Sequence, residues 1–109
     1  MMAQQQDYKV VYRVIDAMDA PHGGRILRLR QKAGEAPKAR ELKGAKMVAR
    51  APGGEERTVE VEGFAVFGGK PDDARIRKTG RVDLRVFDLD ENPADPISFD
   101  WELAGPLED

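Results

Sequence analysis

Cysteine is absent from the 109 residues of this chain, and histidine occurs only once. Without cysteine there is no disulfide, no thiolate metal site and no cysteine nucleophile. The histidine, His22, lies between Pro21 and Gly23, a composition that a turn explains fully. It has neither the ligand spacing of a zinc site nor an evident nucleophile and orienting partner. We therefore expect a non-enzymatic protein with no cofactor and no metal.

Long apolar runs are also missing. No stretch approaches the ~20 apolar residues of a membrane-spanning helix, and the N-terminal residues MMAQQQDYKV contain no apolar signal-peptide core. Together with the absence of cysteine, this predicts a cytoplasmic protein that does not contact a membrane. The length suits one domain that buries roughly two thirds of its unfolded surface.

Positive charge is missing from the C-terminal part of the chain. All 18 lysines and arginines lie at or before Arg85, whereas the acidic residues number 12 up to Phe87 and 8 after it. The first 87 residues therefore carry +6 and residues 88–109 carry −8. We divide the chain into a flexible N-terminus (1–7), a β-barrel body (8–87) and an acidic tail with a short apolar strand (88–109).

Strand patterns dominate what is present. Val59 and Val61 alternate with glutamates, and Gly63 shifts the apolar phase by one residue, which predicts a β-bulge or bend. Residues 82–86 alternate in the same way. Residues 8–17 and 25–30, separated by a Pro- and Gly-rich turn, predict a hairpin. The sequence therefore predicts an all-β fold, a small six- or seven-stranded barrel or sandwich with little helix.

Three segments between these strands are harder to assign. Residues 31–40 are polar and predict a loop. Residues 42–51 contain helix-forming residues, but Gly44 interrupts them and Pro52 stops them, so a strand is favoured over a helix. Residues 72–78 suit either one turn of helix or a short strand. In the tail, two prolines predict a linker before residue 97.

The tail ends in a strict alternation. Ile97, Phe99, Trp101 and Leu103 alternate with polar residues, which predicts a strand with one apolar face. That strand either docks on its own barrel, where Phe99 and Trp101 would join the core, or adds to a sheet of another protein.

A basic stripe is the main candidate binding feature. Its predicted members are Lys78 and seven arginines of two strands and of the segment between them. The arginines are Arg25, Arg28, Arg30, Arg75, Arg77, Arg81 and Arg85. Three interpretations remain open: a solvated face offset by Glu60 and Glu62, a docking face for an acidic protein or the chain's own tail, and a nucleic-acid surface. The segment Gly68-Gly69-Lys70 lacks the remaining residues of a phosphate-binding loop and predicts a turn.

The order of these elements resembles the second domain of translational GTPases such as elongation factor Tu. That domain's glycine turn and following strand correspond to ELKGAKMVAR, and its long strand, loop and closing strand to VEVEGFAVFGGKPDDARIRKTGRVDLRV. The resemblance covers about residues 10 to 87 and implies a small β-barrel. Before the closing strand the family has Ala-Gly-Asp-Asn, whereas this chain has residues 78–81, Lys-Thr-Gly-Arg. No aminoacyl-tRNA contact is therefore carried over.

From these features we expect a binding or assembly module that contacts another protein through the basic stripe or through Phe99 and Trp101. The alternatives are an RNA- or nucleotide-binding barrel and an accessory domain of an enzyme formed by several chains.

Overall fold

The computed structural model describes residues 8–65, 73–90 and 96–107. Its elements, in chain order, are β1 (Val10–Asp19), β2 (Arg25–Gly34), α1 (Ala39–Leu42), β3 (Lys46–Arg50), β4 (Glu56–Phe64), α2 (Asp73–Thr79), β5 (Arg81–Asp88) and β6 (Glu102–Gly105). In the described part of the chain, no helix is both long and apolar enough to cross a membrane.

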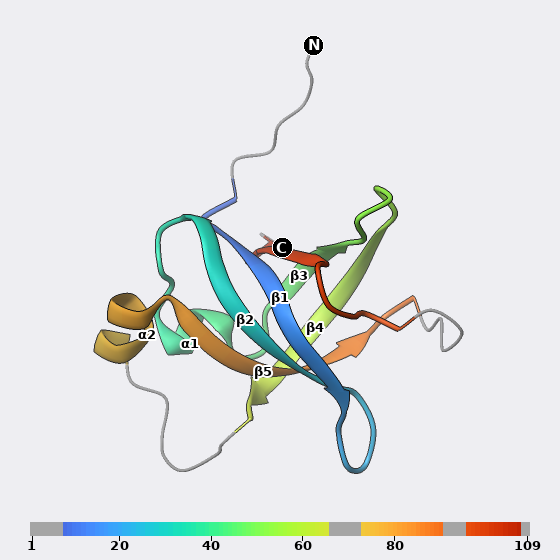
Figure 1. The fold of residues 1–109 in the computed structure, drawn as a ribbon. Coiled ribbons are helices and arrows are strands. Elements are labelled where there is room, and N and C mark those ends of the chain that lie inside the picture. Colours follow the sequence, from blue (N-terminus) through green and yellow to red (C-terminus); the bar gives the residue numbers. More distant parts are fainter. Residues whose placement is uncertain (1–7, 66–72, 91–95, 108–109) are drawn as a thin grey trace.

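The six described strands form a closed antiparallel barrel in the order β1-β2-β5-β4-β3-β6 (Figure 1). The predicted all-β barrel with little helix is confirmed. Alternate residues of each strand point inward, so the core contains Tyr12 of β1, Leu29 of β2, Val61 of β4 and Leu84 of β5. These side chains are almost fully buried and account for the apolar alternation in the sequence.

The predicted irregularity at Gly63 is confirmed. The pairing of β4 with β5 shifts register between Val61 and Gly63, so that Val61 lies opposite Val86 and Gly63 opposite Arg85. The extra residue, Glu62, changes the phase of β4 and bends the strand.

The predicted hairpin of β1 and β2 is also confirmed, but β2 is longer than expected. Residues 31–34, predicted as loop, continue β2 and pair with the first residues of β1, with a register shift that leaves Lys32 as the extra residue. Their polar composition is tolerated because three of these four residues are exposed. A strand needs backbone partners but not an apolar face where it leaves the core.

Two short helices lie at one end of the barrel (Figure 1). Residues 46–50 are a strand, as favoured by the sequence, but residues 39–42 form α1, whose Leu42 is buried in the core. The undecided segment around residue 75 is α2, and its Ile76 is also buried in the core. The Ala39 N–H donates to the Asp73 carboxylate over 2.7 Å, which joins the two helices.

The strand predicted over residues 97–103 is wrong in its first half. Residues 99 and 100 form a turn with Asp100 at φ +74°, and β6 begins only at Glu102. Trp101 and Leu103 point inward as predicted, whereas Phe99 is 58% exposed rather than buried. The turn directs Phe99 outward while Ile97 before it and Trp101 after it stay buried, which periodicity alone cannot reveal. β6 lies between β1 and β3 and closes the barrel.

Candidate functional site

Three elements bring most of the predicted basic residues together. Arg30 of β2 lies directly opposite Arg81 of β5 in the antiparallel register. The Gln31 N–H donates to the Gly80 carbonyl oxygen over 2.6 Å, which holds the C-terminal end of α2 against β2. The C-terminal end of α2, which carries Lys78, therefore lies beside the strands that carry Arg30 and Arg81.

Five of these side chains are exposed and have neither a hydrogen bond nor an ion pair with any residue that the structure describes. We call them the basic surface, and its members are Arg30, Arg75, Arg77, Lys78 and Arg81. Like charges placed directly opposite each other on neighbouring strands repel and destabilise the sheet. A cluster of this kind is an attractive position for an anionic group, because an anion would relieve the repulsion.

The other three predicted basic residues are neutralised within the chain. Arg25 pairs with Asp19 over 2.8 Å and donates to the Ile97 carbonyl, and Arg28 lies 3.4 Å from Asp83. Arg85 is 3.3 Å from Glu62, one of the two glutamates expected to offset the stripe. The predicted stripe thus divides into three structural arginines and a basic surface of five cations.

Arg13, which the sequence interpretation did not include, lies between the basic surface and Phe99. It lies opposite Arg30 on β1. Its Nε donates to the Asp100 carboxylate over 2.7 Å, and its guanidinium lies 5.3 Å from the centre of the Phe99 ring. The sequence did indicate that Arg13 is exposed. It alternates with Tyr12 and Val14, whose side chains point inward, so the Arg13 side chain points outward.

Phe99 and Trp101, predicted to act together, have different environments. Phe99 is the most exposed large apolar side chain in the described residues, and Trp101 is only 4% exposed. Trp101 belongs to the core and fixes the chain before β6. Only Phe99 is therefore available to contact a partner.

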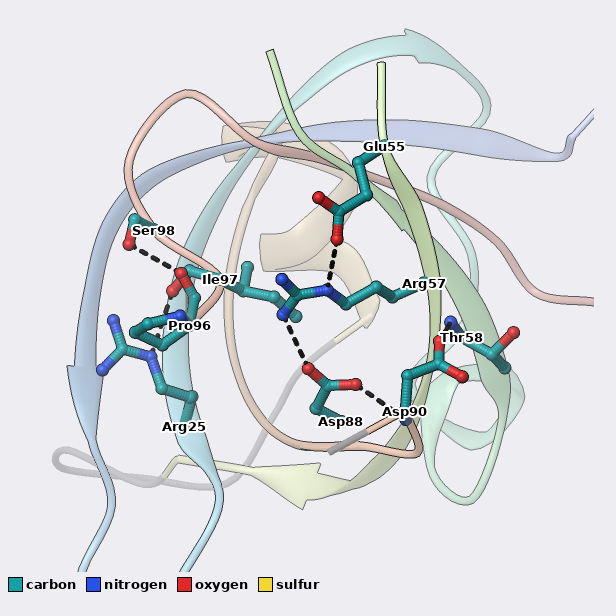
Figure 2. Close-up of polar contacts among 9 residues, drawn as sticks. All are labelled: Arg25, Glu55, Arg57, Thr58, Asp88, Asp90, Pro96, Ile97 and Ser98. Carbon is teal, nitrogen blue, oxygen red and sulfur yellow. Dashed lines mark hydrogen bonds and ion pairs between the residues drawn. The ribbon is translucent and has the colours of Figure 1, made fainter. Parts of the chain in front are cut away.

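The opposite end of the barrel contains a buried arginine that the sequence interpretation missed. The Arg57 side chain is 3% exposed and lies between Glu55 and Asp88 (Figure 2). Its Nη1 donates to Asp88 over 2.9 Å, its Nε donates to Glu55 over 3.1 Å, and its guanidinium stacks 5.0 Å from the Trp101 ring. Burial alone would lower the pKa of Arg57, but these carboxylates raise it above its usual value.

The network around Arg57 joins segments that are distant in the sequence. Asp88 accepts a hydrogen bond from the Asp90 N–H, and Asp90 accepts one from the Thr58 N–H (Figure 2). Across the barrel end, the Arg25 Nε donates to the Ile97 carbonyl over 3.0 Å. These contacts hold the end of β5 and residues 96–101 in place. The arrangement is structural, because two carboxylates and the Trp101 ring already contact the buried guanidinium.

Catalytic features do not assemble in the part of the chain that the structure describes. His22 is exposed in the β1–β2 turn at φ +68°, and no group of three or more histidines and carboxylates that could hold a metal lies among the described residues. A hollow lined by residues of β1, β2 and β5, including Met18 and Ile26, has a volume of about 10 Å³, enough for about one water molecule. The segment Gly68-Gly69-Lys70 lies outside the described residues.

Comparisons with protein-family models, with curated proteins and with solved structures found no match to this chain. The fold and the geometry of the site are therefore the basis for a functional proposal.

Proposed function

We propose that this chain is a non-enzymatic binding module that recognises an acidic segment of another protein through the basic surface. One observation carries the proposal: five exposed cations of β2, α2 and β5 have no carboxylate partner in the described structure, while Arg25, Arg28 and Arg85, which lie on β2 and β5, all have one. Four of the five are arginines, whose planar guanidinium suits bidentate contacts with carboxylates.

The shape of the molecule supports surface recognition rather than enclosure of a ligand. The inside of the barrel is filled by side chains such as Tyr12, Leu29 and Leu84, which are all fully buried. A closed barrel also leaves few free strand edges for an added strand. Binding through exposed charges therefore fits this fold better than binding through a pocket or by strand addition.

A second candidate is a single-stranded nucleic acid, and Phe99 is the observation that favours it. An exposed aromatic ring near a cationic surface can stack on a base while the cations contact phosphates. The acidic partner remains the preferred proposal, because Phe99 is a single ring and the carboxylate of Asp100 lies beside it.

The resemblance to the second domain of translational GTPases enters here as a proposed relationship. A closed six-stranded antiparallel barrel agrees with what the resemblance implies for the fold. It adds no contact residue to the proposal, since the family's Ala-Gly-Asp-Asn segment is replaced by residues 78–81.

The test uses poly-L-glutamate and an oligothymidine of about 10 nucleotides as probes at low salt, with binding followed by fluorescence anisotropy. A triple variant with glutamine at Arg75, Arg77 and Lys78 should bind poly-L-glutamate about tenfold more weakly, because three exposed ion pairs of ~0.2–1 kcal/mol each are lost. Added salt should weaken binding to the unmodified chain.

The matched control removes three cations that already have carboxylate partners: Lys9, Lys32 and Arg50. This triple glutamine variant has the same net charge as the first one and should bind poly-L-glutamate within about twofold of the unmodified chain. Equal losses in both variants would mean that only the overall charge matters. Tighter binding of oligothymidine, weakened by Phe99→Ala, would favour the nucleic-acid candidate.

A further inference from the structure

We propose that the binding surface continues around the barrel from Arg81 to Phe99, and that it accepts an extended segment with a large apolar residue at one end and carboxylates at the other. This inference rests on the proposed function and specifies the partner of the same site. The residues that carry it form one row, which we call the Phe99–Arg81 row: Phe99, Arg13, Arg30 and Arg81.

The row is continuous across three neighbouring strands. Arg13 of β1 lies opposite Arg30 of β2, and Arg30 lies opposite Arg81 of β5. All three side chains are exposed on the outer face of the barrel. Because these residues are direct partners in the strand pairing, the row runs perpendicular to the strands. Each step along it covers the ~4.8 Å between paired strands. A segment bound along it would cross β1, β2 and β5 instead of pairing with any of their edges.

Phe99 is held in an outward position by the protein itself. The Asp100 N–H donates to the Val14 carbonyl over 2.9 Å, and the Trp101 N–H donates to the Ser98 carbonyl over 3.3 Å. The Arg13 guanidinium stacks on one face of the ring. A side chain that is already ordered loses little conformational entropy when a partner covers it, which favours its use as an anchor.

The charge along the row changes from one end to the other. Near Phe99, Asp100 neutralises Arg13, and Glu102 pairs with Lys32. At the far end, neither Arg30 nor Arg81 has a counter-charge among the described residues. An apolar group suits the first end because little net charge is present there, and carboxylates suit the second.

The dimensions set the spacing that the partner needs. The Arg13 guanidinium is 5.3 Å from the Phe99 ring, and two steps between strands add about 10 Å. An extended chain advances ~3.3 Å per residue, so a row of about 15 Å corresponds to about four or five residues. We therefore expect an aromatic or large aliphatic residue followed by carboxylates about three to five positions along.

The experiment compares three synthetic peptides with the full chain at low salt by isothermal titration calorimetry. One has a phenylalanine, a spacer of about three residues and a run of glutamates. In the second peptide, the phenylalanine lies on the other side of the glutamates and is separated from them by a longer spacer. The third has only the spacer and the glutamates. The first peptide should bind about fivefold more tightly than the other two.

Phe99→Ala should abolish that preference and leave binding of the glutamate-only peptide within about twofold. Leu89→Ala is the matched control, since Leu89 is another exposed apolar residue (45%) whose backbone pairs with Thr58 of β4, away from the row. It should leave all three affinities unchanged. A double variant, Arg30→Gln with Arg81→Gln, should weaken the binding of all three peptides.

The two proposals can fail separately. Suppose that the glutamate-only peptide binds and the double variant weakens its binding, while Phe99→Ala has no selective effect. The proposed role of the Phe99–Arg81 row is then wrong, and the proposal of an acidic partner stands. If no glutamate peptide binds, the proposed function itself is wrong. If oligothymidine binds more tightly than every peptide and Phe99→Ala weakens it, the row serves a nucleic acid and both proposals are overturned.

Discussion

Tyr12 carries a phenolic hydroxyl into the interior of the barrel. Its side chain is fully buried, and its hydroxyl has no hydrogen-bond partner among the described residues. Burial raises the pKa of Tyr12 to about 12, because the phenolate would be poorly solvated inside the barrel. The aromatic ring contributes to the core, while the hydroxyl costs stability.

Replacing Tyr12 by phenylalanine should therefore raise the free energy of unfolding by about 1 kcal/mol at neutral pH, measured by urea denaturation. The free energy of unfolding of the unmodified chain should also fall by about 2 kcal/mol between pH 10 and pH 12, because the unfolded chain releases the phenolic proton first. Tyr12→Phe should lack this part of the alkaline loss. A clear loss of stability in Tyr12→Phe would show that the hydroxyl is bonded.

Arg57 is the residue whose removal should cost most among the charged side chains. Arg57→Leu should lower the free energy of unfolding by about 3 kcal/mol, because Asp88 would keep its charge in a mostly buried position without a cationic partner. Combining it with Asp88→Asn should recover part of the loss in a double-mutant cycle.

Arg50→Leu is the control for Arg57. Arg50 pairs with Glu56 over 2.6 Å, but both side chains are about half exposed. Its removal should cost less than about 1 kcal/mol. Equal losses for Arg50→Leu and Arg57→Leu would mean that the network in Figure 2 contributes no more than a surface ion pair.

The position of Arg57 could have been predicted, whereas its partners could not. It shares parity with Val59 and Val61, which places its side chain inward at the start of β4. Asp88 and Trp101 are distant in the sequence, and nothing in the local pattern indicates that they meet there. Parity predicts which side chains are inside, but pairing register decides what they contact.

At the scale of elements, the alternating strands were predicted well because each one repeats the two-residue apolar–polar pattern several times. Gly63 was informative because the apolar residues before it are odd-numbered and the next one, Phe64, is even-numbered. The alternation from Ile97 to Leu103 misled because the turn at residues 99 and 100 keeps the apolar spacing while changing direction. The short helices α1 and α2 each bury one residue, too few to give a helical period.

The pairing of β2 with β5 leads to a prediction about the basic surface. Arg30 and Arg81 are directly opposite and repel, so Arg81→Gln should raise the free energy of unfolding by about 0.5 kcal/mol at low salt. The gain should disappear at high salt, where the repulsion is screened. Arg28→Gln, which removes a contact with Asp83, should give no gain. A loss in Arg81→Gln at low salt would contradict the repulsion argument.

At the scale of the whole molecule, β6 decides whether the barrel is closed. The closing strand comes last in the sequence and has only four residues, but it pairs with both β1 and β3. The sequence predicted that an apolar strand in the tail could dock on the barrel. It could not predict that this strand lies between two others, because closure depends on strand order, which no local pattern encodes.

Deleting all residues from Ile97 onward should prevent the chain from folding as a stable monomer. The deletion removes Ile97, Trp101 and Leu103 from the core, worth roughly 1.5–3 kcal/mol each, and the total is comparable with the whole stability of a small domain, about 5–15 kcal/mol. It also frees edges of β1 and β3, which invites association between chains. Circular dichroism and size-exclusion chromatography with light scattering would measure both effects.

Two point variants separate loss of the core from loss of the segment itself. Trp101→Ala should lower the free energy of unfolding by about 3–5 kcal/mol, whereas Phe99→Ala should change it by less than about 0.5 kcal/mol, because Phe99 is mostly exposed. The single tryptophan reports the same state by fluorescence, with blue-shifted emission in the dilute folded chain. Emission typical of indole in water, together with an unchanged melting temperature after the deletion, would show that β6 does not close this barrel in solution.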